Sequence, residues 1–389
     1  MRTSFPINKF RNVKTPFYYY DTRILRDTLA CLNKEAGKYD NYCVHYAVKA
    51  NVNPKLLAIV REAGLGVDCV SGGEIQAAMQ AGFPADKIVY AGVGKADWEI
   101  NLGLECDIFS FNVESVAELE VINELAAAKN KIANVAFRIN PNVGAHTHAH
   151  IVTGLAENKF GVSMDDMDRV IDIAKGMSHV RFTGLHFHIG SQITDMDDFV
   201  ALCNRINELQ ERLSARRIVV EHINVGGGLS IDYQQPDRFP IPNFEEFFAV
   251  YDKHLILRAG QTLHFELGRS VVGQCGNLIS KVLYVKEGTN KKFVILDAGM
   301  TDLIRPALYQ AYHKIENITS DEAVEVYDVV GPICESSDVF GNAVDLNKTK
   351  RGDFVAIRSA GAYGEIMASG YNCRELPKGY VWEELESKE

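Results

Sequence analysis

Short apolar runs, rich in β-branched and aromatic residues, recur through the first ~270 residues of the chain. The first of them, 43–51, is apolar on both faces and ends where Asn51 and Pro54 break the pattern. A strand of this kind is typical of a buried parallel sheet. Eight strands are predicted in this way: 43–51, 66–71, 88–92, 108–112, 135–140, 182–190, 222–228 and 263–269.

Amphipathic segments lie between these runs, with apolar residues at every third or fourth position. The clearest are 73–81, 113–128, 164–175 and 197–213, and each predicts a helix. Strand and helix alternating eight times favours an α/β fold of the (β/α)₈ barrel type. A doubly wound open sheet is the competing architecture.

The pattern changes after residue 269. Short β-type runs are separated by Gly, Asn and Asp turns, and no long amphipathic helix intervenes, so a mostly β domain is predicted. The runs are 279–285, 293–296, 323–330 and 353–357. The run 16–20 precedes the barrel and could pair with this domain. We therefore expect a barrel at 25–272 and a β domain formed by 1–24 with 273–389.

Composition narrows the class of protein. The 389 residues are 47% hydrophobic and 24% charged, as in a soluble globular enzyme. The formal charge of −10 argues against a nucleic-acid or anionic-membrane partner. No apolar run is long enough to span a bilayer, and the first 14 residues lack the apolar core of a secretory signal. Eight cysteines without a CxxC pair predict reduced thiols and a cytoplasmic location.

Catalytic residues of a barrel gather at the carboxyl ends of its strands. Polar residues and glycines stand at these ends here: Lys49, Asp68, Asn112, Arg138, His188, Gly226, Gly227, Gly228, Glu266 and Arg269. An amine that leaves a dry interior, such as that of Lys49, loses its proton readily and can condense with a carbonyl group. A lysine that merely reaches the solvent from a strand end is the alternative.

Four further features point to a flat, phosphorylated cofactor. The backbone of Gly226–Gly228 could approach a phosphate closely, although a plain loop is possible. Glu266 could keep a pyridine nitrogen protonated, or could pair with an arginine as a structural ion pair. His188 could lie flat against an aromatic ring, whereas His186 is the better candidate for a core histidine. Arg269 could bind a phosphate or a carboxylate through both guanidinium nitrogens.

His146, His148 and His150 alternate along one segment and could face a metal ion. No carboxylate or cysteine lies nearby to complete such a site, and a polar loop explains the run as well. We expect no metal.

Several motifs recur in the order seen in one enzyme family. The chain resembles the fold-type III pyridoxal-phosphate decarboxylases from about Pro16 to Tyr371. The matching motifs are 46–51 (YAVKAN), 68–74 (DCVSGGE), 153–161 (TGLAENKFG), 188–192 (HIGSQ), 226–228 (GGG), 266–269 (ELGR), 297–313 (DAGMTDLIRPALYQAYH), 331–338 (GPICESSD) and 361–364 (GAYG).

The resemblance implies a role for each matching residue. Lys49 would bind pyridoxal 5′-phosphate covalently, Glu266 would pair with its pyridine nitrogen and His188 would stack on its ring. The other residues implied around the cofactor are Asp68, Ser191, Gly226, Gly227, Gly228, Gly268, Arg269 and Tyr363.

The resemblance also implies that Cys334 protonates the substrate carbon after CO₂ has left. Taken alone, Cys334 would rather suggest a buried structural thiol. Cys334 would reach the site from a second subunit together with Glu335, so a homodimer with shared active sites is expected. The implied catalytic set is Lys49, His188, Glu266 and Cys334. The implied substrate-binding set is Arg269, Arg305, Tyr309, Glu335 and Tyr363.

Substrate choice depends on the far end of the amino acid. Arg305 and Arg269 suit a second carboxylate, and Glu335 suits a second ammonium group. The resemblance thus implies conversion of meso-diaminopimelate to L-lysine and CO₂. Leu267 and Ser337 replace the proline and glycine of many members, and Ser337 leaves the chain-length preference open. The alternatives are a decarboxylase for a basic amino acid or carboxylated polyamine, and a non-catalytic cofactor-carrying barrel.

Overall fold

The computed structural model describes residues 5–144 and 159–386, which form two compact units. The barrel unit comprises Leu29–Ser230 and Asn243–Gly268. The β unit comprises Met1–Thr28, Ile231–Pro242 and Arg269–Glu389. Residues 231–242 thus belong to the β unit although barrel segments flank them on both sides. The domain limits expected from the sequence remain a prediction.

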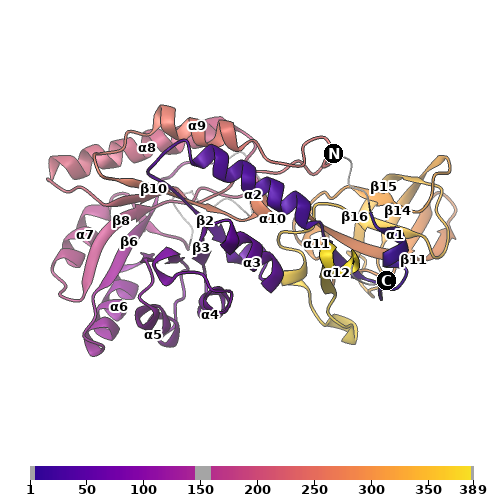
Figure 1. Cartoon of the computed structure of the whole chain (residues 1–389), viewed down its shortest axis with the longest axis horizontal. Helices are drawn as coiled ribbons and strands as arrows, with labels where there is room; N and C mark the ends of the chain where they lie inside the picture. Colours follow the sequence, from indigo (N-terminus) through magenta and orange to yellow (C-terminus); the bar gives the residue numbers. More distant parts are fainter. Residues whose placement is uncertain (1–4, 145–158, 387–389) are drawn as a thin grey trace. The chain divides into compact units, whose positions relative to one another are not determined.

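Eight parallel strands close into a barrel, which confirms the predicted fold class (Figure 1). Their order is β5-β4-β3-β2-β10-β9-β8-β6, and pairing of β5 with β6 completes the circle. A short strand, β7 (Val162–Ser163), lies parallel to the end of β6. The barrel strands are β2 (Tyr42–Ala47), β3 (Gly66–Cys69), β4 (Ile88–Tyr90), β5 (Ser110–Val113), β6 (Ala133–Asn140), β8 (Val180–His186), β9 (His222–Asn224) and β10 (Thr262–Leu267).

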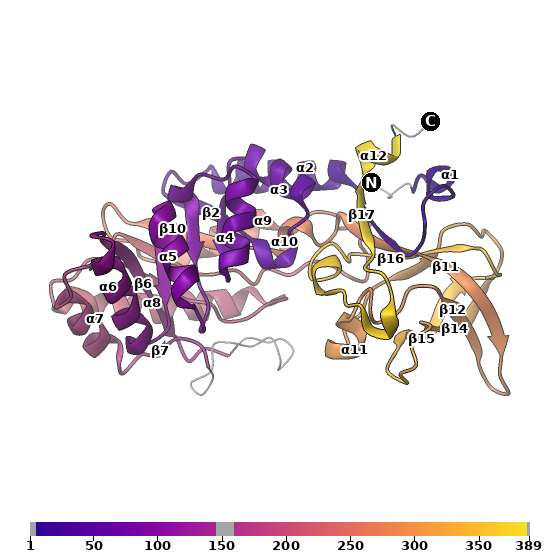
Figure 2. The same ribbon diagram turned by 90° about the horizontal axis from the view of Figure 1, so that it is seen from below.

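Helices follow the strands and lie outside the barrel (Figures 1 and 2). Serine side chains begin two of them: Ser71 accepts a hydrogen bond from the Glu74 N–H and Ser115 one from the Glu118 N–H. The four helices predicted at 73–81, 113–128, 164–175 and 197–213 are all present, with ends shifted by a few residues. The helices are α2 (Thr22–Ala36), α3 (Pro54–Glu62), α4 (Gly72–Gln80), α5 (Asp97–Cys106), α6 (Val116–Ala128), α7 (Met167–Lys175), α8 (Met196–Ala215) and α9 (Phe244–His254).

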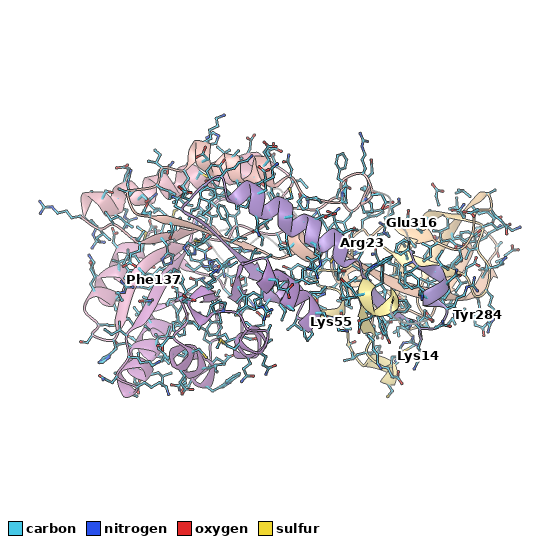
Figure 3. All side chains as sticks on the ribbon, viewed as in Figure 1. Lys14, Arg23, Lys55, Phe137, Tyr284 and Glu316 are labelled. Carbon is cyan, nitrogen blue, oxygen red and sulfur yellow. The ribbon has the colours of Figure 1, made fainter. Side chains whose placement is uncertain are left out.

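The barrel is packed with aromatic and imidazole rings. Phe137 of β6 is fully buried and stacks on Phe182 with ring centroids 5.2 Å apart (Figure 3). His45 and His264 also stack, and His45 Nε2 lies 2.8 Å from His264 Nδ1. Glycines make room for the imidazoles, since a Cβ on Gly184 would lie 2.3 Å from Nε2 of His222. Burial lowers the pKa of His45 and His264, and that of His222 to about 3, so these rings are neutral.

The β unit is built on an eight-stranded sheet of order β13-β16-β11-β12-β14-β15, with β1 beside β11 and β17 beside β1. The predicted pairing of the N-terminal run with this domain is therefore confirmed. The strands are β1 (Phe17–Tyr20), β11 (Gly276–Glu287), β12 (Lys292–Leu296), β13 (Ile315–Asn317), β14 (Val324–Val330), β15 (Val339–Asn347), β16 (Phe354–Ile357) and β17 (Lys378–Val381). Short helices are α1 (Ile7–Phe10), α10 (Arg269–Val272), α11 (Arg305–Tyr309) and α12 (Trp382–Glu386).

The first predicted strand extends too far. Lys49 lies in a single 3₁₀ turn, η1 (Val48–Ala50), directly after β2, because the Asn51 N–H bonds to the Val48 carbonyl and closes the turn. Arg269, predicted at a strand end, opens helix α10. Within residues 5–144 and 159–386, no helix has both the length and the apolar character needed to cross a membrane.

Candidate active site

Lys49 and Asp68 form an ion pair at the carboxyl end of neighbouring barrel strands. Lys49 Nζ lies 3.2 Å from Oδ2 of Asp68, and the lysine side chain is 37% exposed while the aspartate is fully buried. Burial, followed by the charge of Glu266, raises the pKa of Asp68 to about 7, although Lys49 opposes the rise. The second oxygen of Asp68, Oδ1, is buried and has no hydrogen-bond partner in the described part of the chain. A buried acceptor of this kind is suited to a ligand donor.

Glu266 is a buried carboxylate that receives three hydrogen bonds within the barrel unit. Asn224 donates to Oε1 at 2.7 Å and Asn112 at 3.3 Å, while His186 Nε2 lies 3.1 Å from Oε2. Burial alone would raise the pKa of Glu266, but His186, Lys49 and His188 outweigh burial and hold the pKa below its usual value. The predicted alternative of an ion pair with arginine is wrong, since histidine and amide groups surround this carboxylate.

His188 lies against the glycine loop formed by Gly226–Gly228. The Gly227 N–H donates to His188 Nδ1 at 3.3 Å. Burial first, then Arg138 and Lys49, lowers the pKa of His188 well below its usual value, so the ring is neutral. A Cβ on Gly226, whose φ is +69°, would lie 2.7 Å from His188 Nδ1, and one on Gly227 would lie 1.9 Å from the Glu266 carbonyl oxygen. Only glycine fits at these two positions.

Gly268 and the segment that carries Ser191 contact neighbouring parts of the same barrel rim. The segment that carries Ser191 is tied to the glycine loop, because the Ile193 N–H donates to the Gly228 carbonyl at 2.8 Å. A Cβ on Gly268 would lie 3.1 Å from the Cβ atoms of both Ala47 and Ala50, which flank the Lys49 turn. The barrel residues predicted for cofactor binding therefore converge at one end of the barrel.

Two buried guanidinium groups share a tyrosine in the β unit. Arg269 Nη1 donates to the Tyr233 hydroxyl at 2.6 Å, and Arg305 Nη2 lies 3.5 Å from the same oxygen. The Tyr363 ring lies under both, 5.0 Å from Arg269 and 6.0 Å from Arg305. In the described ranges, no carboxylate oxygen lies within 4.0 Å of the Arg305 guanidinium nitrogens. The predicted Tyr309 lies near the same group, 5.8 Å from Arg305.

Arg305 is positioned by a histidine that the sequence did not single out. Arg305 Nε donates to His313 Nε2 at 3.3 Å, and His313 Nδ1 lies 2.9 Å from the Arg358 carbonyl oxygen. Burial lowers the pKa of His313 to about 3, with Arg305 contributing, so the ring stays a neutral acceptor. Burial also lowers the pKa of Arg305, and the charge of Arg269 adds to this. The two cations thus favour an anion between or beside them.

Cys334 and Glu335 are exposed on a turn of the β unit. Asp338 holds this turn, because its carboxylate accepts hydrogen bonds from the Met300 N–H at 2.6 Å and the Ile333 N–H at 2.7 Å. Because the Cys334 side chain is exposed in the β unit, the interpretation of Cys334 as a buried structural thiol is wrong.

Residues 26–273 match the family described as "Pyridoxal-dependent decarboxylase, pyridoxal binding domain". The chain belongs to this family. Similar curated proteins are the diaminopimelate decarboxylases of Bacteroides thetaiotaomicron, 76% identical over 99% of this chain and 100% of that protein, and of Aquifex aeolicus, 39% identical over 92% and 84%.

Solved structures of the pyridoxal-dependent decarboxylase family match over nearly the whole chain. The diaminopimelate decarboxylase of Helicobacter pylori, complexed with L-lysine, has a TM-score of 0.89 and 38% identity, covering 97% of this chain and 94% of the other. A lysine/ornithine decarboxylase from Vibrio vulnificus has a TM-score of 0.84 at 22% identity, covering 97% of each chain, and shares the fold.

The barrel residues fit the pyridoxal phosphate of this family. An amine, an ionised buried carboxylate, a neutral imidazole, a side-chain-free loop and the unsatisfied Asp68 Oδ1 are present on one rim. In that order, these groups would meet the aldehyde, the pyridine nitrogen, the ring face, the phosphate and the remaining polar ring substituent of the cofactor.

Sequence reasoning missed several partners of the predicted residues. His186 contacts Glu266, and its position two residues before His188 on one strand face was the available signal. Asn224 lies in the predicted strand 222–228, two residues before the glycine loop, but was not singled out. Tyr233 lies in a segment for which nothing was predicted. His146, His148 and His150 lie outside the described residues, and within the described ranges no group of three His, Cys, Asp or Glu side chains could hold a metal.

Proposed function

We propose that this chain decarboxylates meso-diaminopimelate to L-lysine. One C–C bond of the substrate breaks, CO₂ leaves, and a proton takes the place of the lost carboxylate. The observation that carries the substrate assignment is the pair of buried guanidinium groups, Arg269 and Arg305, that share Tyr233. A substrate with a second carboxylate would meet this charge, whereas ornithine and lysine have none to offer. The names of the relatives support the same assignment.

Within the barrel unit, the proposed cofactor residues are Lys49, Asp68, His188, Ser191, Gly226, Gly227, Gly228, Glu266 and Gly268. The bound cofactor supplies an electron-accepting ring. Lys49 would hold it covalently. Glu266, ionised because His186, Lys49 and His188 outweigh its burial, would keep a proton on the pyridine nitrogen. The neutral ring of His188 would cover one face without adding charge.

Within the β unit, the proposed substrate residues are Arg269, Arg305, Tyr309, Glu335 and Tyr363, with Arg269 and Tyr363 also near the cofactor phosphate. Cys334 would deliver the proton to the substrate carbon, because an exposed thiol can donate and then recover its proton from water. We further propose that the chain acts as a homodimer in the cytoplasm, with Cys334 and Glu335 contributed to the partner's site.

The test is a substrate panel with product identification. The purified protein should release CO₂ and L-lysine from meso-diaminopimelate and turn over L-ornithine and L-lysine poorly. Arg305→Ala should raise KM for meso-diaminopimelate by about one to two orders of magnitude, because a charge-assisted hydrogen bond is lost. Arg351→Ala, at an exposed position of the same unit, is the matched control. Faster CO₂ release from ornithine or lysine would contradict the substrate assignment and favour a decarboxylase for basic amino acids.

A further inference from the structure

We propose that Tyr371 and Asn372 are positioning residues that hold Glu335 and Cys334 for the reaction; this inference rests on the roles proposed above for that pair. The two residues open the 3₁₀ turn η5 (Tyr371–Cys373) of the β unit. Each contacts one member of the pair through its side chain. Tyr371 entered the sequence prediction only as the limit of the family resemblance, and Asn372 was not singled out.

The Asn372 amide presents both of its polar atoms to the Cys334 sulfur. Oδ1 lies 3.5 Å and Nδ2 lies 3.4 Å from Sγ. A thiol can donate its S–H to Oδ1, and a thiolate can accept an N–H bond from Nδ2. The same amide therefore serves the sulfur before and after the proton leaves it. In the proposed step the S–H bond breaks as the substrate C–H bond forms, and the thiolate later regains a proton from water.

Tyr371 links the two members of the pair. Its hydroxyl donates to Glu335 Oε1 at 2.8 Å and lies 4.0 Å from Cys334 Sγ. The hydrogen bond to Glu335, followed by contact with Cys334, raises the pKa of Tyr371 to about 12, so the hydroxyl keeps its proton and remains a donor. A carboxylate that accepts this bond keeps one fixed direction toward an ammonium group.

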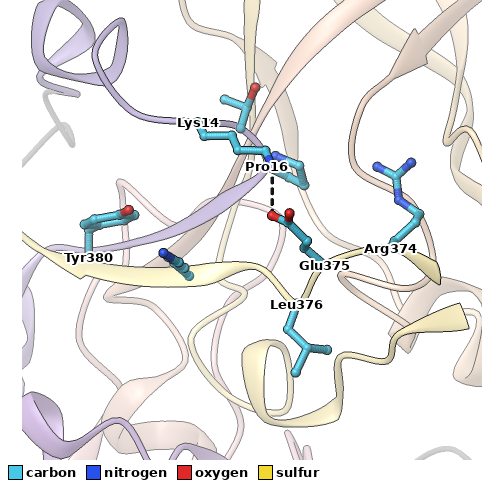
Figure 4. A pocket seen from close by; sticks show the side chains of 8 residues that line it. Lys14, Pro16, Arg374, Glu375, Leu376 and Tyr380 are labelled. Atoms are coloured by element: carbon cyan, nitrogen blue, oxygen red, sulfur yellow. Dashed lines mark hydrogen bonds and ion pairs between the residues drawn. The ribbon is translucent and has the colours of Figure 1, made fainter.

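The backbone of the turn is suited to this task. Asn372 has a φ of +56°, in the left-handed region that asparagine adopts more readily than most residues. The two residues after the turn are anchored. The Arg374 guanidinium donates to the Asp297 carbonyl, and Glu375 pairs with Lys14 at 2.7 Å (Figure 4). Asp338 fixes the opposing turn as described above. The backbone that carries the Asn372 amide and the backbone that carries the Cys334 thiol are therefore each fixed by their own contacts.

The first test measures the acidity of Cys334 without using turnover. On the cofactor-loaded enzyme, the rate of Cys334 alkylation by iodoacetamide is followed against pH by peptide mass spectrometry. Asn372→Asp keeps an acceptor for the thiol but replaces the donor with a negative charge, so the pH midpoint should rise by roughly one unit. Asn372→Gly keeps the left-handed backbone and removes both contacts, so a smaller rise is expected. Asn130→Asp, at an exposed asparagine with φ of +52°, is the matched control.

The second test separates the two residues kinetically. Asn372→Asp should lower kcat about tenfold with little change in KM, because only the proton transfer is affected. Tyr371→Phe should instead raise KM about tenfold, because Glu335 loses the donor that orients it. Tyr284→Phe, at an exposed tyrosine of β11 (Figure 3), should change neither constant.

An unchanged alkylation midpoint in Asn372→Asp would overturn the role of Asn372, and an unchanged KM in Tyr371→Phe that of Tyr371. Failure of the proposed function gives a different result. If Cys334 is not the proton donor, Cys334→Ala retains near-wild-type turnover even when the alkylation midpoint shifts as expected in Asn372→Asp.

Discussion

Glu266 illustrates how a buried carboxylate can be kept ionised by its neighbours. A buried carboxylate normally takes up a proton, because burial disfavours its charged form. Here His186, followed by Lys49 and His188, outweighs burial, and the pKa falls below the usual value instead. Asn112 and Asn224 donate hydrogen bonds to the same carboxylate. The carboxylate therefore carries its charge at neutral pH.

Glu266→Gln should lower kcat by about two orders of magnitude, because a neutral amide cannot hold a proton on the pyridine nitrogen. The substitution conserves shape, so the cofactor should still bind. Steady-state CO₂ release, with cofactor content read from absorbance, measures both quantities. Glu221→Gln, at an exposed glutamate paired with Arg181, is the control. Turnover within a few fold of the wild type would rule out this role for Glu266.

Residue types at strand ends could be predicted, but their partners could not. Lys49, Asp68, His188 and Glu266 follow apolar runs, and a barrel places such positions on one rim. Their neighbours His186 and Asn224 come from other strands, and only the closed barrel brings them to Glu266. The distances from Glu266 to His186 and Asn224 could therefore not be predicted from the sequence alone.

At the scale of elements, burial decided which strands could be predicted. All eight barrel strands are apolar runs buried in a closed parallel sheet, so each leaves a clear signal. In the β unit, β15 (Val339–Asn347) has partly exposed faces and polar residues such as Asn342 and Asp345, and it was missed. The predicted strand at 43–51 extended into the Lys49 turn because Val48 and Ala50 are buried as deeply as the strand itself.

The barrel strands also carry neutral histidines that predict a response to acid. His222 is buried, and its pKa falls to about 3. The unfolded chain takes up a proton on this residue near pH 6.5, whereas the folded chain does not until about pH 3. The stability contributed by the neutral ring is thus fully present above about pH 6.5 and is lost as the pH falls toward 3.

His222→Gln should therefore flatten the loss of stability on acidification, by up to about 1.4 kcal/mol per pH unit below pH 6.5. Urea unfolding of the wild type and the variant, at several pH values between 7.5 and 5, measures the two slopes. His254→Gln, at a partly exposed position at the end of α9, should keep the wild-type slope. Equal slopes in His222→Gln and the wild type would show that this ring does not titrate on unfolding.

At the scale of the whole molecule, each unit carries its own set of the proposed residues. The barrel unit supplies the residues proposed for the cofactor, and the β unit supplies Cys334, Glu335 and the two arginines. Cys334 and Glu335 are exposed on the β unit, where a second copy of the chain could receive them. A dimer with two-fold symmetry would use each such turn once, giving two equivalent sites.

This proposal predicts that two inactive variants restore each other. A Lys49→Ala chain and a Cys334→Ala chain, co-expressed in equal amounts, form mixed dimers in half of all cases. If Lys49 and Cys334 of one site come from different chains, each mixed dimer has one intact site, and activity should return to about a quarter of the wild-type value. If both come from the same chain, no site is intact and the mixture stays inactive.

The matched control mixes Lys49→Ala with Glu266→Gln. Both residues belong to the barrel unit of one chain, so every site in the mixed dimer lacks one of them and activity should remain near that of Glu266→Gln alone. Recovery in the first mixture but not in the second would assign Cys334 to the partner's site. Recovery in neither, with dimers present by sedimentation, would place a complete site in each chain.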